Sequence, residues 1–422
     1  MEQYIAAGFQ NTVDFELEWD QLRLEELIRQ ENIRREEISV VCPIQSQRDL
    51  LRTLLSHMAG GTGSECLASS SQITRGFARH FHYQVTLGGT AVRAAMALEK
   101  IGYRSVIHAC SLNKHFRRLI PQQVQWVASV PDEGEDFHPH VIMQYPANAH
   151  IQVGDIDLTT QRPNRVIFAY DPPSVALHIT EDFGQQVRHA PVFLAASFNI
   201  APCSSTFRST DSSFNIIKEE SVLRQRLATA IRIIDRMPLP RVVVMEDACF
   251  ENPAMQRLVA ETLAPHLDVF SMNEDELQSR LGRSVDVRSP QQVAQAVRKV
   301  YEQLNVSTVV CHSAYWALAY GKPVTGMAQA LQAGVAMAAT RFRLGDDYDW
   351  ADYQETMALP PRGWAVEFAA QLESLLGQKL ICVPGKDLDH IAHPVTIGLG
   401  DAFIGGMLPA FLTEEQRHLA EF

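Results

Sequence analysis

Arg241-Val242-Val243-Val244-Met245 is the stretch from which the fold of this sequence can be worked out. A β-branched run this short predicts a buried strand, and Pro238 and Pro240 end the helix expected over 221–236 just before it. Helices and strands then alternate, with strands expected over 267–271 and 306–311 and helices over 253–266, from 274, and over 290–304. This alternation indicates βαβ units, and therefore a parallel sheet covered by helices.

The N-terminal half is less regular and predicts a second, smaller sheet. Alternating apolar residues over 80–86 and within 140–170 are typical of strands that have one exposed face. Residues 17–37 are rich in Glu and Arg, so we expect an exposed helix there. The sequence as a whole predicts a parallel α/β body with a smaller sheet inserted near its N-terminal side.

Length and charge argue against several classes of protein. The 422 residues include 37 Lys and Arg against 49 Asp and Glu, a net charge of −12, which disfavours nucleic acid as a partner because phosphate backbones attract basic surfaces. No run of 18 apolar residues predicts a membrane span, and the N-terminus lacks the pattern of a signal peptide. The seven cysteines form no CxxC pair, so we expect reduced thiols in a cytoplasmic protein.

The sharpest functional signal is Gly398-Leu399-Gly400-Asp401, followed at once by an apolar segment that suits a helix. Glycines just before a helix let backbone N–H groups converge, and the helix dipole adds positive potential, so this pattern suits an anion hole for a phosphoryl group. Asp401 within it is placed to take a proton from an attacking hydroxyl. The competing interpretation is a glycine-rich turn in which Asp401 only caps the helix.

Two acidic segments follow predicted strands, at the edge of the sheet where ligands bind in open α/β folds. Asn273 and Glu276 stand where a strand ends and a helix begins, and they suit a hydrated Mg²⁺, which keeps several of its waters. Glu246 and Asp247 directly follow the strand at 241–245. The alternative for each segment is an ordinary acidic helix start or cap.

Two further segments predict contacts with a small polar ligand. Gly88 and Gly89 open an alanine-rich helix and allow a bound molecule to approach the backbone closely, although tight helix packing explains them equally well. Asp14 follows the first predicted strand and suits hydrogen bonds from sugar hydroxyls, with a turn aspartate as the simpler alternative.

In this order, the five motifs resemble the ribokinase superfamily and, within it, the ADP-dependent glucokinase and phosphofructokinase family. The block at 398–401 matches the superfamily's GxGD motif, and 273–276 matches its NxxE motif. The resemblance implies a ribokinase-like three-layer sandwich spanning residues 1–422, with a mostly parallel central sheet. It also implies a small β-rich lid, formed by insertions roughly within 13–40 and 111–189.

The same resemblance implies a role for each candidate residue in Mg²⁺-dependent phosphoryl transfer from ADP to a hexose or hexose phosphate. Asp401 is the implied base, Gly398 and Gly400 form the anion hole, and Glu246 and Glu276 support Mg²⁺. The implied sugar contacts are Asp14, Gly88, Gly89, Glu65, Asn164 and Arg165, and the implied nucleotide contacts are Asn273, Val383, Gly398 and Leu399. The adenine pocket is expected along 381–384 and the helix at 327–342.

Departures from the family pattern leave the donor and the acceptor open. Val244 stands where the family's HxE motif has its His, and Thr90 stands where its GGN motif has Asn. The donor is therefore ADP or ATP, and the acceptor is glucose or fructose 6-phosphate. Glu65 favours glucose, because a carboxylate repels a second phosphate. Cations that suit a sugar phosphate are Arg93, Lys114, Arg162, Arg165 and Arg208.

Two other functions compete with this one. The first is an ATP-dependent ribokinase-like kinase of another sugar or a nucleoside. The second is a catalytically silent sensor of sugar or nucleotide, against which the retained Asp401 argues. The oligomeric state is not predicted.

Overall fold

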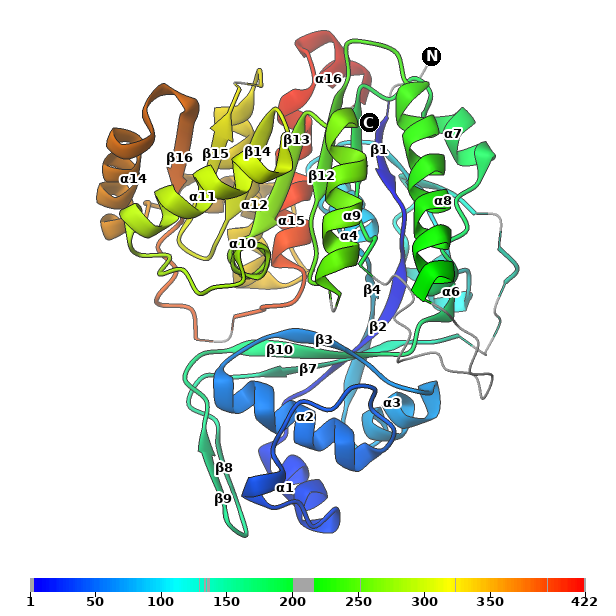
Figure 1. Ribbon diagram of the computed structural model, residues 1–422, viewed down its shortest axis with the longest axis vertical. Helices are drawn as coiled ribbons and strands as arrows, with labels where there is room; N and C mark the ends of the chain where they lie inside the picture. The colour runs from blue at the N-terminus through cyan, green and yellow to red at the C-terminus, as the bar shows by residue number, and fades with distance from the viewer. Residues whose placement is uncertain are drawn as a thin grey trace.

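The larger sheet is built from strands of both halves of the chain. The structure, a computed structural model, describes residues 4–128, 130–132, 134, 137–199, 216–250, 252–322, 324–392 and 394–420. The strands of this sheet are β1 (Ile5–Gly8), β5 (Ser105–His108), β6 (Val124–Val127), β11 (Val192–Ala195), β12 (Val242–Glu246), β13 (Val269–Asn273), β14 (Thr308–His312), β15 (Trp316–Gly321) and β16 (Leu380–Pro384). Their order is β16-β15-β14-β13-β12-β11-β1-β5-β6, as Figure 1 shows. Neighbours pair in parallel except around β15, which runs antiparallel to β14 and β16.

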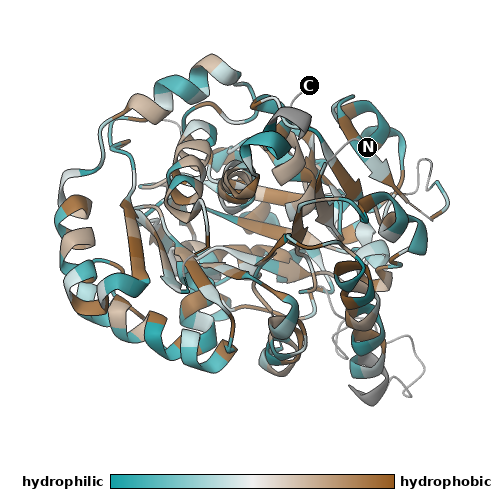
Figure 2. Ribbon diagram, turned by 90° about the horizontal axis from the view of Figure 1, so that it is seen from above, coloured by the Kyte–Doolittle hydropathy of each residue, from teal (hydrophilic) through white to brown (hydrophobic). Residues whose placement is uncertain are grey.

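Helices cover both faces of this sheet because its strands are apolar on both sides. Side chains of successive strand residues point to opposite faces, so Ile5 and Ala7 join one buried cluster and Ala6 joins the other. The first cluster is covered by α4 (Thr90–Lys100), α12 (Met327–Leu344) and α15 (Leu399–Met407), and the second by α7 (Glu181–Val187), α8 (Ile216–Asp235), α9 (Pro253–Leu263), α10 (Glu274–Leu281), α11 (Pro290–Leu304) and α14 (Gly363–Leu376). Figure 2 shows the apolar strands between helices whose outer sides are hydrophilic. The predicted three-layer α/β sandwich is confirmed.

A second lobe lies below the carboxyl edge of the large sheet in Figure 1. Its sheet has the order β3-β10-β7-β2-β4, from β2 (Thr12–Leu17), β3 (Ser64–Leu67), β4 (Tyr83–Gly88), β7 (His140–Tyr145) and β10 (Asn164–Ala169). The remaining elements of this lobe are α1 (Gln21–Gln30), α2 (Gln47–Gly60), α3 (Ser71–Ala78) and the hairpin of β8 (His150–Val153) and β9 (Ile156–Thr159). Two of the sheet's strands, β3 and β4, lie outside the insertions expected within 13–40 and 111–189.

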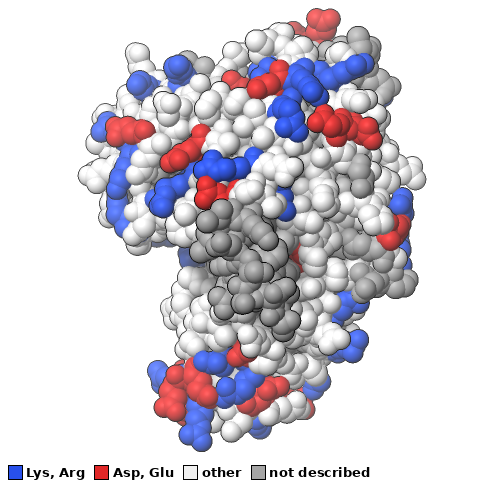
Figure 3. Space-filling model, turned by 45° about the vertical axis from the view of Figure 1, so that its right-hand side comes forward, with Lys and Arg blue, Asp and Glu red and all other residues white. Residues whose placement is uncertain are grey.

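Shorter helices complete the described chain. They are α5 (Lys114–Leu119), α6 (Pro172–Ala176), α13 (Trp350–Ala358) and α16 (Glu414–Ala420). Within the described ranges, no helix is long and apolar enough to cross a membrane. On the face shown in Figure 3, acidic and basic side chains are mixed on both lobes.

The helix expected over 17–37 is shorter at both ends, because α1 spans only Gln21–Gln30. Leu17 is the last residue of β2 and is buried in the smaller sheet, where it pairs with Tyr83 of β4. The helix begins only at Gln21, after Asp20, whose Oδ1 accepts a hydrogen bond of 2.9 Å from the backbone N–H of Arg23. The Glu- and Arg-rich composition correctly indicated a helix. It did not indicate that residue 17 belongs to the preceding strand, because that depends on pairing with β4.

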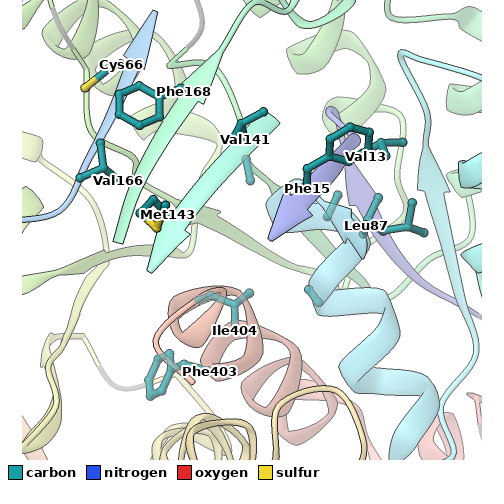
Figure 4. Close-up of a cluster of buried hydrophobic side chains, with 14 of the residues drawn as sticks. Val13, Phe15, Cys66, Leu87, Val141, Met143, Val166, Phe168, Phe403 and Ile404 are labelled. Atoms are coloured by element: carbon teal, nitrogen blue, oxygen red, sulfur yellow. The ribbon is translucent and has the colours of Figure 1, made fainter. Parts of the chain in front are cut away.

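The two lobes share one apolar cluster beside the predicted anion hole. In Figure 4, Phe403 and Ile404 of α15 lie on the side of the smaller sheet that faces the body, with Val141 and Met143 of β7 among the side chains above them. Gln144, the next residue of β7, also bonds to the loop before α15. Its Oε1 accepts hydrogen bonds from the backbone N–H and the hydroxyl of Thr396, at 2.8 and 2.9 Å. The smaller sheet therefore packs directly over the amino end of α15.

Candidate active site

The amino end of α15 carries the Gly398-Leu399-Gly400-Asp401 block, as the sequence predicted. Gly398 adopts a left-handed backbone with φ +68°, which favours glycine, and the helix begins at the next residue. A methyl carbon added to Gly398 would lie 2.8 Å from Cδ of Arg93 and 3.1 Å from Nε of Arg341. The backbone amides at this helix end are thus flanked by two buried guanidinium groups, which add positive charge to the helix dipole.

Asp401 remains partly accessible in the first turn of α15, with 22% of its side chain exposed. The adjacent Gly400 lies against the carboxyl edge of the large sheet, because a methyl carbon there would be 3.5 Å from Cε1 of His312 and 3.8 Å from Oε1 of Glu246. On its other side, Oδ2 of Asp401 lies 4.0 Å from Nε of Arg93. Asp401 therefore stands between an acidic edge of the large sheet and the smaller sheet.

An imidazole reaches Glu246 although the HxE pattern lacks its histidine. Nε2 of His312, at the end of β14, hydrogen-bonds Oε1 of Glu246 at 3.0 Å, and the ring stacks on Phe403. Burial lowers the pKa of His312 to about 4, so this imidazole is neutral near pH 7. The local pattern around Val244 could not predict this contact, because His312 lies 66 residues further along the chain than Glu246.

The Asn273–Glu276 segment forms a complete capping box at the start of α10. Oδ1 of Asn273 accepts from the backbone N–H groups of Asp275 and Glu276, at 2.8 and 2.9 Å. Oε2 of Glu276 accepts from the backbone N–H of Asn273 at 2.8 Å. The simpler interpretation, a capped helix, is therefore correct for the local geometry, and it leaves Oε1 of Glu276 available for a further role.

Buried carboxylates gather beside this cap. Burial raises the pKa of Glu246 and of Glu276 well above the ordinary value, and the charge of Asp247 adds to both shifts. Only Asp247 of these three has an arginine partner in the described part of the chain, Arg280, with Nε at 2.5 Å. Glu246 Oε2 is buried and has no hydrogen-bond partner among the described residues. In the same residues, no three His, Cys, Asp or Glu side chains converge on one point as direct ligands of a metal.

The candidate sugar residues of β2 and β4 do come together. Asp14 is buried, and it accepts hydrogen bonds from the hydroxyl of Thr12 at 2.7 Å and from Nη2 of Arg93 at 2.8 Å. A methyl carbon on Gly88 would lie 2.3 Å from Oδ2 of Asp14, so the glycine is required for this approach. Gly89 has φ +90° and would place a methyl carbon 2.7 Å from the carbonyl oxygen of Gln10.

Glu65 belongs to a network of charged side chains that the sequence did not predict. His140 lies opposite Asp14 in the pairing of β2 and β7, and its Nδ1 is 3.5 Å from Oε1 of Glu65. Its Nε2 bonds Oδ2 of Asp171 at 2.9 Å. Burial alone would lower the pKa of His140, but the hydrogen bond and charge of Asp171 raise it to about 9. Burial also raises the pKa of Glu65. A lone histidine in a strand carries no sequence signal that would have identified it.

Asn164 and Arg165 lie at the start of β10, against the glycine-rich turn at 61–63. Nδ2 of Asn164 donates to the carbonyl oxygen of Gly61 at 3.2 Å, and Nη1 of Arg165 donates to Oδ1 of Asn164 at 3.2 Å. No hydrogen bond or ion pair among the described residues joins them to Asp14 or Glu65. Their sugar-binding role stays a prediction.

The adenine pocket expected along 381–384 and the helix at 327–342 stays a prediction, and the structure shows only how its residues pack. Val383 lies on β16, opposite Ala317 of β15. Together with Ile381 it packs against the same apolar cluster as Met327 of α12 and the residues of α15. Leu399, the first residue of α15, follows Gly398 directly. Arg208, one of the predicted sugar-phosphate cations, lies outside the described residues.

Comparisons with known proteins agree with this architecture. A phosphofructokinase from Pyrococcus horikoshii OT3, solved with AMP, superposes with a TM-score of 0.70 at 17% identity over 99% of this chain and 98% of that chain. An ADP-dependent kinase in complex with fructose-6-phosphate and ADPβS gives 0.73 at 13% identity, over 98% and 94%. The last common ancestor of ADP-dependent phosphofructokinases from Methanosarcinales gives 0.67 at 14%, over 99% and 94%. These likenesses show a shared fold.

The fold is thus that of the ribokinase-like kinases, and the sequence narrows the class further. The model of the ADP-specific phosphofructokinase/glucokinase conserved region matches residues 3–360. The chain belongs to this ADP-specific family, which makes it a sugar phosphotransferase. No curated protein sequence gives a significant match.

Proposed function

We propose that this protein transfers the β-phosphoryl group of ADP to a hydroxyl of a hexose, with Asp401 as the general base. The observation that carries the proposal is the place of Asp401, between the acidic edge at Glu246 and the smaller sheet that holds Asp14. A hydroxyl held near Asp14 and a phosphoryl group at the amino end of α15 would meet beside this carboxylate. Phosphoryl transfer needs such positioning and charge stabilisation more than covalent chemistry by the protein.

Each residue then has a defined task in the reaction. The hydroxyl proton passes to the carboxylate of Asp401 as the hydroxyl oxygen forms its bond to the β-phosphorus. The bond between this phosphorus and the bridging oxygen breaks, and AMP leaves. Backbone N–H groups from Gly398 to Asp401 hold the transferred group, and the guanidinium groups of Arg93 and Arg341 lie beside that helix end.

The residues beside the cap of α10 fit a Mg²⁺ ion held through water. Glu246 has a buried oxygen without a hydrogen-bond partner among the described residues, and burial raises the pKa of both Glu246 and Glu276, so a nearby cation would favour their ionised forms. Since no set of direct ligands converges among the described side chains, the ion would keep most of its waters. When bound with the donor, Mg²⁺ neutralises charge on the phosphates.

The acceptor that best fits the smaller sheet is an unphosphorylated hexose such as glucose. The two cations beside Asp14 are already bonded to carboxylates, Arg93 to Asp14 and His140 to Asp171. Glu65 stands beside them and would repel a second phosphate whenever it is ionised. Hydroxyl groups, in contrast, suit a site with several carboxylate acceptors.

Fructose 6-phosphate is the second candidate, on account of two arginines of the smaller lobe. Nε of Arg162 donates to the carbonyl oxygen of Gly61 at 2.7 Å, and Nη1 of Arg165 donates to Oδ1 of Asn164 at 3.2 Å. Among the described residues neither guanidinium forms an ion pair with a carboxylate, so both keep their charge for an anion. Either could hold a phosphate carried by the sugar.

The test is a matrix of ADP and ATP against glucose, fructose 6-phosphate, ribose and a nucleoside, with Mg²⁺, measured as release of AMP or ADP. We expect turnover with ADP and glucose, and none after Asp401→Asn. Turnover with ADP and fructose 6-phosphate alone would transfer the acceptor role to the second candidate. Turnover with ATP alone would overturn the donor, and binding of both substrates without turnover would support the sensor alternative.

A further inference from the structure

Arg93 connects the two halves of the proposed reaction site. It lies in the first turn of α4, four residues after Gly89, and 5% of its side chain is exposed. Its Nη2 donates to Oδ2 of Asp14 at 2.8 Å and to Oε1 of Glu16 at 2.9 Å. One nitrogen of the guanidinium therefore orients the aspartate that is proposed to bind the sugar.

The rest of the same guanidinium faces the amino end of α15. Nε lies 4.0 Å from Oδ2 of Asp401, and Cδ packs against Gly398. Nη1 is buried, lies 3.1 Å from the position of a methyl carbon on Gly398, and has no hydrogen-bond partner among the described residues. The planar, permanently charged guanidinium thus bonds Asp14, the proposed sugar ligand, and lies next to Asp401, the proposed base.

These contacts argue against the simpler roles for this residue. A ligand of a sugar phosphate has to be accessible, whereas Arg93 is buried and paired with two carboxylates, which disfavours the sequence-based expectation for it. Arg93 also reaches beyond the two carboxylates that it neutralises, because its Nε lies 4.0 Å from Oδ2 of Asp401 and its buried Nη1 lies next to Gly398. The neighbouring cavity is lined by both signs of charge, with Lys100, Arg341 and Asp346 beside Arg93.

We propose that Arg93 is a positioning residue for phosphoryl transfer, which keeps Asp14 and Asp401 in a fixed relation through a single guanidinium. This role rests on the proposed function, because Asp14 and Asp401 have their tasks only in that reaction. A lysine would keep the charge, but its single nitrogen cannot replace Nη2 and Nε at two separate sites. The informative measurement is therefore kcat and KM determined separately, because lost positioning lowers kcat while KM for ADP stays the same.

The test compares Arg93→Lys with the matched control Arg343→Lys in the full chain. Arg343 is on α12 and bonds Thr356 and Glu355, so its replacement changes the same side chain away from the site. For Arg93→Lys we expect kcat to fall more than about tenfold, since a small misplacement of the reacting groups is costly. KM for ADP should stay within about twofold, and the control should match the wild type.

A second variant keeps the proposal testable if Arg93→Lys folds poorly. Arg93→Met combined with Glu16→Gln removes one charge of each sign, so it leaves no additional uncompensated buried charge. Against the wild type, which has the same net charge over the side chains at 14, 16 and 93, we expect kcat to fall by about a hundredfold at equal folded fraction. A kcat within twofold of the reference, or a loss that only follows the folded fraction, overturns the proposal. A wild-type chain without sugar-kinase activity would instead refute the proposed function, and this role with it.

Discussion

Gly88→Ala tests whether the close approach of β4 to Asp14 serves the sugar site. The new methyl carbon would lie 2.3 Å from both Oδ2 of Asp14 and Oγ1 of Thr12, while ordinary contact begins at 3.4 Å. The carboxylate would have to move by about 1 Å, the difference between these distances. Gly88 has no positive φ, so the substitution acts through this contact and not through backbone strain.

The magnitude follows from what holds Asp14 in place. Moving its carboxylate weakens the hydrogen bonds from Arg93 and Thr12, and overpacking adds its own cost, so we expect a loss of about 2–4 kcal/mol in the free energy of unfolding. A displacement of about 1 Å in a positioning group lowers kcat/KM for the sugar by about a hundredfold. KM for ADP should not change, because the donor is expected at the other side of α15.

Steady-state kinetics with each substrate varied, together with urea denaturation, provides the measurement. Gly76→Ala is the matched control, because Gly76 is inside α3 and a methyl carbon there meets nothing within 4 Å. The control should keep full activity and gain about 0.5–1 kcal/mol from its helix. Wild-type kcat/KM for the sugar in Gly88→Ala, or equal losses for both substrates, would refute the reasoning.

Three further changes have expected outcomes. Asp401→Asn should lower kcat by about 10²–10⁴ with little change in KM, and an unchanged kcat would remove Asp401 as the base. Glu276→Gln keeps the capping hydrogen bond but removes the charge, so the Mg²⁺ concentration for half-maximal rate should rise about tenfold, and an unchanged requirement would contradict a role near the ion. The folded pKa of His140, about 9, lies above its unfolded value near 6.5. Its stabilisation, up to about 3 kcal/mol, should therefore be complete below pH 6.5 and be lost as pH rises through 9, which His140→Gln should abolish in urea titrations.

Local patterns identified the large sheet well, since the strands expected over 241–245, 267–271 and 306–311 are observed within two residues of those bounds. The reason is that a buried parallel strand needs an uninterrupted apolar run, which any reader of the sequence can find. The smaller sheet was harder to delimit. Whether 12–17 is strand or helix depends on its partner β4, some 70 residues away, and not on its own composition.

For the candidate site, the sequence by itself determined the glycines, the helix starts and the carboxylates that stand at strand ends. These depend on backbone conformation and on capping, which act over a few residues. Only the tertiary structure decided which charges meet: His312 at Glu246, His140 between Glu65 and Asp171, and Arg93 between Asp14 and Asp401. Hydrogen bonds and ion pairs depend on separation in space, which pairing and packing set without regard to distance along the chain.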